Sequence, residues 1–321
     1  LHLSLRRQRQ MCIRDSSYRV RGIKIAIPSN ATVDQNNGRL IYNGIWDGTF
    51  QAQKWCSDPV WCLYDLLVSC RYGFGDQISA SQLNKWDFYK ASVYCNELVD
   101  DGNGGTEPRF SCNISIQTQD EAYKLINDMC SVFRAMPYWG SGTLLFAQDR
   151  PTSAKYLFTN ANVKDEGFQY SGSSLKSRHT VAIVRYLDTE LQEIAFQAVE
   201  DPEGIARYGI VTAEITAFAC TSRSQAYRLG EWLLYSEQKE TETITFTTSL
   251  DTGCAIRPGD VISVSDQTRS GIRRGGRIKA ADYSWVVVDD TEDTDLPTVG
   301  APSISVAMQG GYRKQSIYAI Y

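Results

Sequence analysis

His179 is the only histidine beyond the first sixteen residues, so a serine or cysteine nucleophile in the rest of the chain would need it as a general base. Ser177 lies two positions before it, but that spacing carries no signature of a catalytic triad. Arg178 and Lys176 bring positive charge close to the ring, which disfavours its protonation, and neither is an acid that could orient it. The pattern favours a surface residue at the end of a strand, and we predict no catalytic residue in this chain.

The cysteines offer little to a metal ion. There are nine of them, none in a Cys-x-x-Cys pair, and the closest spacings join Cys56 to Cys62 and Cys62 to Cys70. Zinc sites need cysteines and histidines clustered at shorter spacing, so we predict no metal site. Several cysteines lie within apolar patterns, as small buried residues do: Cys62, Cys95, Cys130 and Cys220. This predicts reduced thiols and folding in the cytoplasm.

Two glycine-rich stretches resemble ligand loops only in part. Asp101–Gly105 begins like a calcium loop, but the twelfth position is Cys112, where an EF-hand needs a glutamate. Gly73–Gly75 follows a predicted helix instead of a strand, which is the wrong context for a dinucleotide site. We interpret the first as a solvated loop and the second as a helix stop. The acidic residues support no particular glycosidase pair, so we predict no cofactor.

The composition is that of an ordinary soluble globular protein. The chain has 321 residues, of which 42% are hydrophobic and 22% are charged, and this length leaves room for two or three domains. No apolar run approaches the ~20 residues that a membrane helix needs, so we predict no membrane span.

Residues 1–16 differ from the rest of the chain. They hold four arginines and one acid, and they lack the apolar centre and cleavage site of a signal peptide. We predict that they are a non-native extension. Without them the balance is 29 basic residues (33 − 4) against 36 acidic ones (37 − 1), or −7. An acidic chain is a poor phosphate binder, which predicts no stable nucleic-acid binding.

The first half of the chain alternates between strand and helix patterns. Strands are predicted over 17–28 and 40–50 with a turn at Asn36–Gly38, and a third is predicted over 110–116. Helices are predicted from Pro59, over 84–98, and from a capping box of Thr118 and Glu121. Their predicted apolar faces are Leu63, Leu66 and Leu67; Trp86, Tyr89, Val93 and Tyr94; and Ala122, Leu125, Ile126, Met129, Val132 and Phe133.

Strand patterns dominate the second half. One long helix is predicted from a cap of Ser222 and Gln225, with Ala226, Leu229 and Leu233 on its buried face. The Pro-Gly turn within 257–262 should deliver a β-branched strand. The predicted strands cover 144–146, 180–186, 194–199, 209–218, 243–248, 261–264, 277–281, 285–288, 303–308 and 316–321. The chain ends within such a strand, which indicates a fragment.

These patterns predict an α+β, β-rich fold. We divide it into the extension 1–16, a β segment over 17–52, an α+β domain over 53–165, a β-rich domain with one long helix over 166–292, and the start of a further β domain over 293–321. The acidic run at 289–295, followed by Leu296-Pro297, is typical of a linker.

The ordered strings of this sequence resemble those of the lambda-like family of phage tip attachment proteins J, also called host specificity proteins. The matches follow the family's order from about residue 18 to about residue 290 and cover most of the chain. The extension 1–16 and the acidic stretch after Tyr283 depart from the family pattern. The matching strings are 42–50, 61–67 with 71–73, 104–110, 148–151, 170–172 with 176–179, 205–210, 220–226 with 229–230, and 257–262.

The resemblance implies a baseplate-hub-like β-rich scaffold in the virion, built as a homotrimer at the tail tip and assembled in the host cytoplasm. It implies neighbouring tail proteins as partners and a part in tail assembly, host attachment and DNA delivery. The family's receptor-reading region lies near the C-terminus of a much longer chain, so a host receptor would be met only through a region absent here. No catalytic residues come with the family.

Three functions remain open from the sequence. The first is the structural tail-tip hub, the second is a receptor-binding adhesin module acting alone, and the third is a tail-associated hydrolase. Aromatic-rich strands suit the first two equally. The scarcity of histidine and the lack of a catalytic motif disfavour the third.

Overall fold

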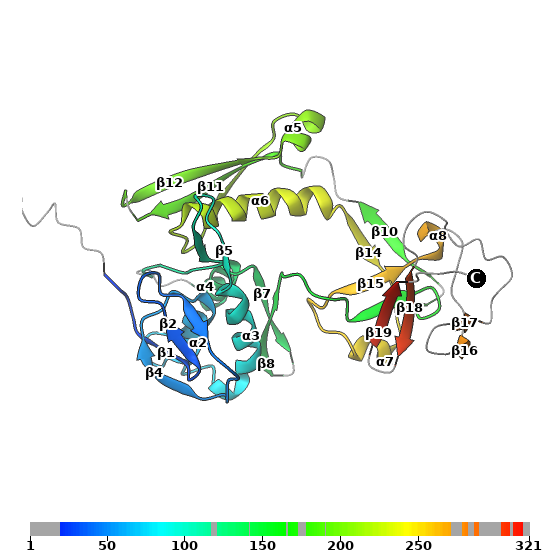
Figure 1. The fold of residues 1–321 in the computed structure, drawn as a ribbon, viewed down its shortest axis with the longest axis horizontal. Coiled ribbons are helices and arrows are strands. Elements are labelled where there is room, and N and C mark those ends of the chain that lie inside the picture. The colour runs from blue at the N-terminus through cyan, green and yellow to red at the C-terminus, as the bar shows by residue number, and fades with distance from the viewer. Residues whose placement is uncertain are drawn as a thin grey trace, which may run out of the picture. The chain divides into compact units, whose positions relative to one another are not determined.

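A computed structural model gives the fold of the chain (Figure 1). It mixes helices and strands with somewhat more strand than helix, which confirms the predicted α+β, β-rich class. The described residues are 20–116, 121–140, 142–164, 166–172, 178–189, 191–270, 278–281, 286–288, 303–308 and 311–316. The extension 1–16, the cap residue Thr118, Ser177 and the acidic run 289–295 lie outside them.

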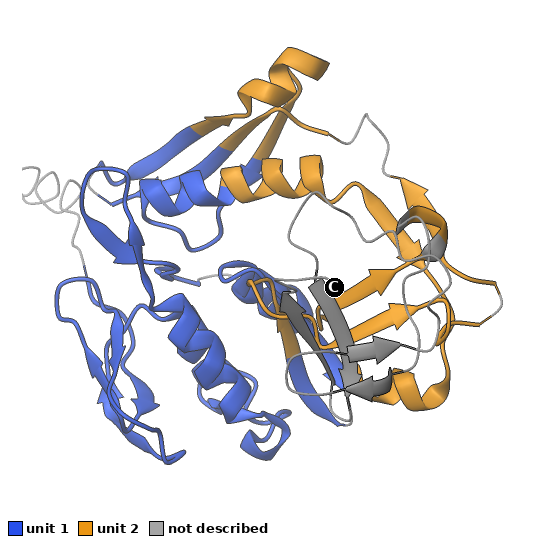
Figure 2. Ribbon diagram, turned by 45° about the vertical axis from the view of Figure 1, so that its right-hand side comes forward, with its two compact units in different colours: residues 1–145, 184–197, 215–229 blue, residues 146–183, 198–214, 230–321 orange. Residues whose placement is uncertain are grey.

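The chain forms two compact units, shown in blue and orange in Figure 2. Unit 1 comprises Leu1–Leu145, Val184–Gln197 and Ile215–Leu229, and unit 2 comprises Phe146–Ile183, Ala198–Glu214 and Gly230–Tyr321. Each unit is therefore built from three separate stretches of sequence. The division into domains made from the sequence stays a prediction.

Unit 1 begins with two small antiparallel pairs. Strand β1 (Ile25–Pro28) pairs with β4 (Phe50–Lys54), and β2 (Ala31–Val33) pairs with β3 (Leu40–Tyr42). The predicted turn is confirmed between β2 and β3, where Gly38 has φ 75°, a value that favours glycine.

The single strand predicted over 40–50 is wrong, because the chain leaves the sheet between β3 and β4. Ile45 is 97% exposed in this loop, whereas Trp46 is buried and its indole N–H donates to the Thr49 carbonyl. The strand predicted over 17–28 is likewise shorter than expected. Val20 and Ile23 precede it and are exposed.

Helix α2 (Pro59–Val68) begins where the sequence predicts. Proline suits the first turn of a helix because its missing N–H would have no partner there. The following glycines end the helix, as predicted, through close packing: a Cβ at Gly73 would lie 1.9 Å from the Leu66 carbonyl oxygen, and one at Gly75 would lie 2.3 Å from that of Val68. Only glycine allows the chain to fold back so tightly.

Helix α3 (Lys85–Cys95) is shorter than the predicted 84–98 and buries a different face. Trp86 is 44% exposed and Val93 is 37% exposed, so the prediction of their burial is wrong. Trp86 is apolar but lies at the edge of the core. It packs edge-on against Trp46, and the rest of its ring is exposed to water, so counting it as a buried residue gave the wrong helix face. The buried residues of α3 are Phe88, Ala91, Ser92 and Cys95.

A short hairpin follows, formed by β5 (Leu98–Asp100) and β6 (Thr106–Pro108). The strand predicted over 110–116 is wrong, because this segment is irregular. Its alternation has a different cause: Phe110 and Cys112 are buried, while the segment's N–H groups donate to separate parts of unit 1. The N–H of Phe110, Cys112 and Asn113 bind the carbonyls of Cys95, Ser57 and Ala219.

Helix α4 (Ala122–Ser131) confirms the third predicted helix but not its cap. Glu121 stands at the N-cap position itself and makes no capping bond with its side chain, so it cannot be the third residue of a capping box. The stripe is also shifted, with Ala122 exposed and Leu125 half-buried. Its fully buried part is Ile126, Met129, Val132 and Phe133.

Replacing Met129 with alanine should lower the free energy of unfolding by about 2 kcal/mol, because its side chain is only 3% exposed. The matched Leu125→Ala should cost less, since that side chain is half-buried. Urea denaturation of both variants would test this order. A larger loss for Leu125→Ala would show that the helix is rotated from the described face.

A three-stranded sheet has the strand order β12-β11-β13. Its strands are β11 (Val181–Asp188), β12 (Glu193–Glu200) and β13 (Thr212–Thr216), with the short helix α5 (Pro202–Tyr208) between the last two. The long helix α6 (Arg223–Lys239) covers one face. Val184 and Tyr186 pack on Ala226 in unit 1, and Ala182 and Val199 pack on Leu234 in unit 2.

Unit 2 also contains two smaller sheets. Strand β9 (Tyr156–Thr159) runs parallel to β15 (Ile262–Ser265), and β10 (Gln169–Gly172) pairs antiparallel with β14 (Glu242–Thr245). The predicted turn before β15 is confirmed, with Gly259 at φ 86°. The remaining described helices are short: η1 (Ala80–Gln82), α7 (Leu250–Cys254) and α8 (Gln267–Ser270). The remaining described strands form three pairs: β7 (Ala135–Gly140) with β8 (Thr143–Gln148), and the antiparallel pairs β16 (Ile278–Ala281) with β17 (Val286–Val288) and β18 (Ser303–Met308) with β19 (Gly311–Ser316).

Candidate functional site

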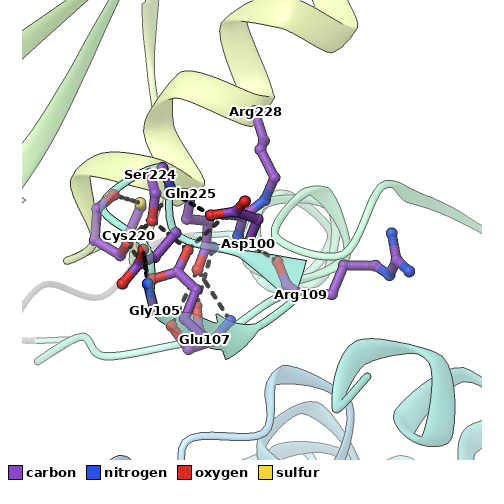
Figure 3. Close-up of polar contacts among 12 residues, drawn as sticks. Asp100, Gly105, Glu107, Arg109, Cys220, Ser224, Gln225 and Arg228 are labelled. Carbon is purple, nitrogen blue, oxygen red and sulfur yellow. Dashed lines mark hydrogen bonds and ion pairs between the residues drawn. The ribbon is translucent and has the colours of Figure 1, made fainter. Parts of the chain in front are cut away.

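The polar centre of unit 1 joins strand β6 to the first turns of helix α6. Figure 3 shows Glu107 directed towards Ser224 and Arg228, which lie more than a hundred positions later in the chain. The carboxylate accepts from Arg228 Nη1 at 2.6 Å and from Ser222 Oγ at 2.7 Å, and Ser224 Oγ also donates to it. We call Glu107, Ser222, Ser224 and Arg228 the β6–α6 network.

The β6–α6 network is held in a largely desolvated place. The side chains of Glu107 and Arg228 are 21% and 19% exposed. Arg228 also donates through Nη2 to the Arg109 carbonyl at 2.9 Å, so one guanidinium binds both ends of the segment 107–109. Charge-assisted bonds of this kind are stronger than neutral ones and fix geometry.

The cap of α6 confirms half of the predicted capping box. Ser222 Oγ accepts from the N–H of Gln225 at 3.2 Å, as expected of an N-cap serine. The Gln225 side chain does not return to the cap residue. It binds Ser111 instead, accepting from its N–H and donating to its carbonyl, so a predicted local bond is replaced by one that spans 114 positions.

A second centre in unit 1 surrounds Asp58, which the sequence analysis missed. Asp58 caps α2 by accepting from the N–H of Trp61 at 2.8 Å, although it is only 1% exposed. Ser92 Oγ and Asn96 Nδ2, both from the end of α3, donate to its other oxygen. The signal was present in the sequence, because an aspartate directly before a helix-initiating proline is a typical cap.

The bonds extend from Asp58 to strand β3. Ser92 has a single hydroxyl proton and gives it to Asp58, so the hydroxyl of Tyr42 must donate to Ser92, at 2.5 Å. Trp61 Nε1 in turn donates to the Tyr42 oxygen at 2.9 Å. Asn96 Oδ1 accepts from the N–H of Leu40 at 2.8 Å. The Asp58 network therefore joins β3, α2 and α3 at one buried carboxyl.

Burial raises the pKa of Asp58 to about 6, although its hydrogen bonds oppose the shift. Burial also raises the pKa of Tyr42 well above its usual value, and the neighbouring Asp58 charge adds to this. A side-chain hydrogen bond with Cys56 and burial raise the pKa of the Cys62 thiol, and burial raises the pKa of the Cys112 thiol to about 12. These thiols are therefore held in the neutral, unreactive form.

His179 has an acid partner, which corrects the interpretation of its surroundings made from the sequence. Its Nδ1 lies 2.9 and 3.0 Å from the two carboxylate oxygens of Glu237, near the end of α6. The Glu237 carboxylate also accepts from the backbone N–H of His179. The Gln238 side chain donates to the backbone carbonyl of His179. No local spacing signals a partner 58 positions away. The pair fixes the start of β11 to α6 within unit 2.

The other candidates show no chemistry of their own. Asp101 accepts from the N–H groups of Asn103 and Gly105, which lowers its pKa, so the loop is closed by its own backbone as the solvated-loop interpretation expects. Among the described residues, no group of three or more histidine, cysteine, aspartate or glutamate side chains is arranged to hold a metal ion. None of the eight described cysteines forms a disulfide. None of the described helices is long and apolar enough to span a bilayer.

Together, these contacts bind the chain to itself. The carboxylates of Glu107, Asp58 and Glu237 each accept several bonds from donors of the same unit. A carboxylate so engaged is a poor general base or metal ligand, because its lone pairs are already used. Each of these carboxylates therefore connects segments of one unit that lie far apart in the sequence.

Comparison with known proteins identifies relatives in phage tails. A family model described as "Putative phage tail protein" matches residues 121–280. The chain is 42% identical over 230 residues to the tip attachment protein J of Escherichia phage SECphi27, which is 71% of this chain and 19% of that protein. It is 34% identical over 286 residues to the protein of the same name from Escherichia phage SECphi4, which is 88% of this chain and 24% of that protein. The chain thus spans about a fifth to a quarter of these relatives' length.

A solved structure is also similar in part. The 43 kDa tail protein of prophage MuSo2 from Shewanella oneidensis matches 48% of this chain and 45% of its own, with 17% identity and a TM-score of 0.34. That likeness is too low to support an argument about function.

Proposed function

This chain is a homologue of the tip attachment proteins J of tailed phages, and from this premise we propose that it is a structural part of the phage tail tip, a hub scaffold without catalytic activity. It supports tail assembly, host attachment and DNA delivery as a rigid support for the parts that act.

The observation that supports a scaffold most is the β6–α6 network. Two of the strings that resemble the family, 104–110 and 220–226, contact each other there, because Ser222 and Ser224 donate to Glu107. Arg228, which lies between 220–226 and 229–230, also binds Glu107 and the Arg109 carbonyl. In an enzyme, we would expect such charged residues to face a substrate. Here they hold two segments of one unit together, which favours a role in shape over one in chemistry.

The proposed partners are copies of the chain itself and the adjoining tail proteins. A homotrimer would form a closed ring, as most symmetric assemblies do. Contacts that are large in a complete particle can be weak in an isolated piece, so we expect a monomer or weak trimer in solution. Assembly would take place in the host cytoplasm, and a host receptor would be met through a part of the longer protein outside this chain.

A chimeric phage tests the scaffold function. The matching 230 residues of the SECphi27 protein would be replaced by those of this chain. We expect infectious particles whose host range is that of SECphi27, since a scaffold positions the receptor-reading part without choosing the receptor. A changed host range would favour the adhesin function. Soluble chimeric protein without tails would contradict a conserved role in assembly.

A direct binding measurement separates the alternatives further. The purified chain, labelled with a fluorophore, should not adsorb to Escherichia cells in a saturable way, and it should not block infection by SECphi27. Saturable, receptor-dependent adsorption would favour the adhesin. Degradation of cell-surface glycan that is lost in His179→Ala would favour a hydrolase using the His179–Glu237 pair.

A further inference from the structure

Three asparagines of this chain are followed directly by glycine: Asn37, Asn43 and Asn103. In such a pair the glycine nitrogen can attack the side-chain carbonyl carbon of the asparagine, because glycine has no Cβ to obstruct the approach. The attack needs a glycine N–H without a hydrogen bond and a backbone that can turn at the asparagine. The three pairs differ in both respects in the folded protein, so their reactivity should differ although the two residue types are the same.

The Asn37–Gly38 pair is held in place. The Gly38 N–H donates to the Asp34 carbonyl at 2.9 Å, and the Asn37 side chain accepts from the N–H of Arg39 at 3.0 Å. Gly38 is buried, and its carbonyl accepts from the N–H of Ser57. Both reacting groups of this pair are therefore already bound, and an attack would first have to break these hydrogen bonds.

The Asn43–Gly44 pair is exposed but lies between two anchored aromatic residues. Tyr42, directly before the pair, belongs to the Asp58 network, and Trp46, two positions after it, is buried. Asn30 binds both members: its carbonyl accepts from the Asn43 N–H at 2.9 Å, and its side chain donates to the Gly44 carbonyl at 3.3 Å. Turning the backbone at Asn43 would therefore disturb contacts on both sides of the pair.

The Asn103–Gly104 pair lies at the tip of the β5–β6 hairpin, among three glycines. Both residues are exposed, and within the described part of the chain no hydrogen bond reaches the Asn103 side chain or the Gly104 N–H. A Cβ at Gly102 or Gly104 would meet nothing within 4 Å. The tip is shaped by Asp101, which accepts from the N–H groups of Asn103 and Gly105. These bonds are local and exposed, and such bonds open more easily than buried ones.

We propose that Asn103 is a site of spontaneous deamidation on the folded protein, which converts it to aspartate and isoaspartate. The Gly104 nitrogen forms a bond to Cγ of Asn103 and loses its proton, while the bond from Cγ to the side-chain nitrogen breaks and that nitrogen leaves as ammonia. Water then opens the cyclic imide, giving its OH to a carbonyl carbon and its remaining proton to the Gly104 nitrogen. Opening at Cγ yields aspartate, and opening at the backbone carbonyl of Asn103 yields isoaspartate.

Either product adds a negative charge to a tip that already carries Asp100 and Asp101. Isoaspartate also lengthens the backbone of the tip by one carbon atom, because the chain then runs through the side chain. This inference goes beyond the tail-tip function. Its test uses the chain alone, so it can fail or succeed whatever the chimeric phage shows.

The test incubates the purified full chain at mildly alkaline pH and follows the exchange of NH2 for OH at each asparagine by peptide mapping and mass spectrometry. In the folded chain, Asn103 should convert at least about tenfold faster than Asn37, with Asn43 between them, which corresponds to a difference in barrier of about 1.4 kcal/mol. In concentrated urea the three rates should become similar, because each asparagine is then followed by an unrestrained glycine. Equal rate ratios in buffer and in urea, or conversion of Asn37 or Asn43 before Asn103, would overturn the proposal.

Two variants of the same residue provide the controls. Asn103→Gln should abolish the first acidic form seen by isoelectric focusing, because the longer side chain closes a larger ring more slowly. Asn103→Asp supplies the charge of the product and should run with that acidic form from the start. Both variants change an exposed side chain, so their urea unfolding should match that of the unaltered chain. An acidic form that appears at an undiminished rate in Asn103→Gln would contradict the assignment.

Discussion

Replacing Glu107 with glutamine should lower the free energy of unfolding of the chain by about 3 kcal/mol, because it leaves the Arg228 guanidinium without its counter-charge in a place where both side chains are four-fifths buried. Glutamine has nearly the same shape, so packing is preserved. Its amide group also meets the donors Ser222 and Ser224, which had faced a pure acceptor. Denaturation by urea, followed by far-ultraviolet circular dichroism, would give the loss.

The chain contains a matched control for this variant. Glu97 forms an ion pair with Arg109 at 2.8 Å, but their side chains are 51% and 30% exposed. Exposed pairs contribute little, so Glu97→Gln should cost less than about 1 kcal/mol. Equal losses of unfolding free energy for the two variants would show that the β6–α6 network stabilises the protein no more than an exposed ion pair does. The double variant Glu107→Gln/Arg228→Met should recover part of the loss, since the unpaired charge is then removed.

Replacing Asp58 with alanine should cost about 4 kcal/mol, the larger of the two effects. The variant removes the cap of α2 and leaves the donors Ser92 and Asn96 without an acceptor in a buried place. The bond from Tyr42 to Ser92 would then also rearrange. Thermal unfolding should show one cooperative transition at a clearly lower temperature. A neutral outcome would mean that water replaces the carboxylate.

The free energy of unfolding should depend on pH in a way that identifies Asp58. Its pKa is raised from 3.8 to about 6 in the folded protein, so the folded state binds the proton more tightly than the unfolded state. The stabilising contribution is complete below the unfolded value and is lost as the pH rises through about 6. The unfolding free energy should therefore increase as the pH falls from about 7 to about 4, by up to about 3 kcal/mol from this group.

The titration of other carboxylates should not hide this increase in stability between about pH 7 and about pH 4. Hydrogen bonds lower the pKa of Asp47 and of Asp266 to about 2, so their opposing losses come at lower pH. Burial raises the pKa of Asp65, which acts in the same direction as Asp58. Asp58→Asn should flatten the increase in stability, whereas Asp251→Asn, an exposed acid in the first turn of α7, should leave it in place. An increase that persists in Asp58→Asn would assign the proton to another group.

Local patterns predicted those elements whose contacts are themselves local. The stripe of α4 at Ile126, Met129 and Phe133 follows the helical period, and the Pro-Gly turn before β15 needs only its own residues. The start of α2 and the serine cap of α6 are of the same kind. Each of these depends on side chains a few positions apart, which a sequence displays directly.

The remaining errors come from bonds between distant segments. Residues 110–116 alternate as a strand would, but the structure describes them as irregular. The N–H groups of Phe110, Cys112 and Asn113 donate to the carbonyls of Cys95, Ser57 and Ala219. Glu107 and Arg228 carry no local signal, because what makes them a pair is a fold that spans 121 positions. The same holds for His179 and Glu237. Sequence alone could name these residue types but not their partners.

The discontinuity of unit 1 sets an order on its folding. Its last stretch, Ile215–Leu229, includes the serines and the arginine that bind Glu107, so residues 1–145 leave the ribosome without these partners. At about 5–20 residues per second, the 121 positions between Glu107 and Arg228 correspond to a delay on the order of ten seconds. During that time the Glu107 carboxylate, Ser111 and Asn113 lack the segment that binds them. Nascent chains arrested shortly before Ile215 should therefore remain sensitive to protease and attractive to chaperones, and those extended well past Leu229 should be neither.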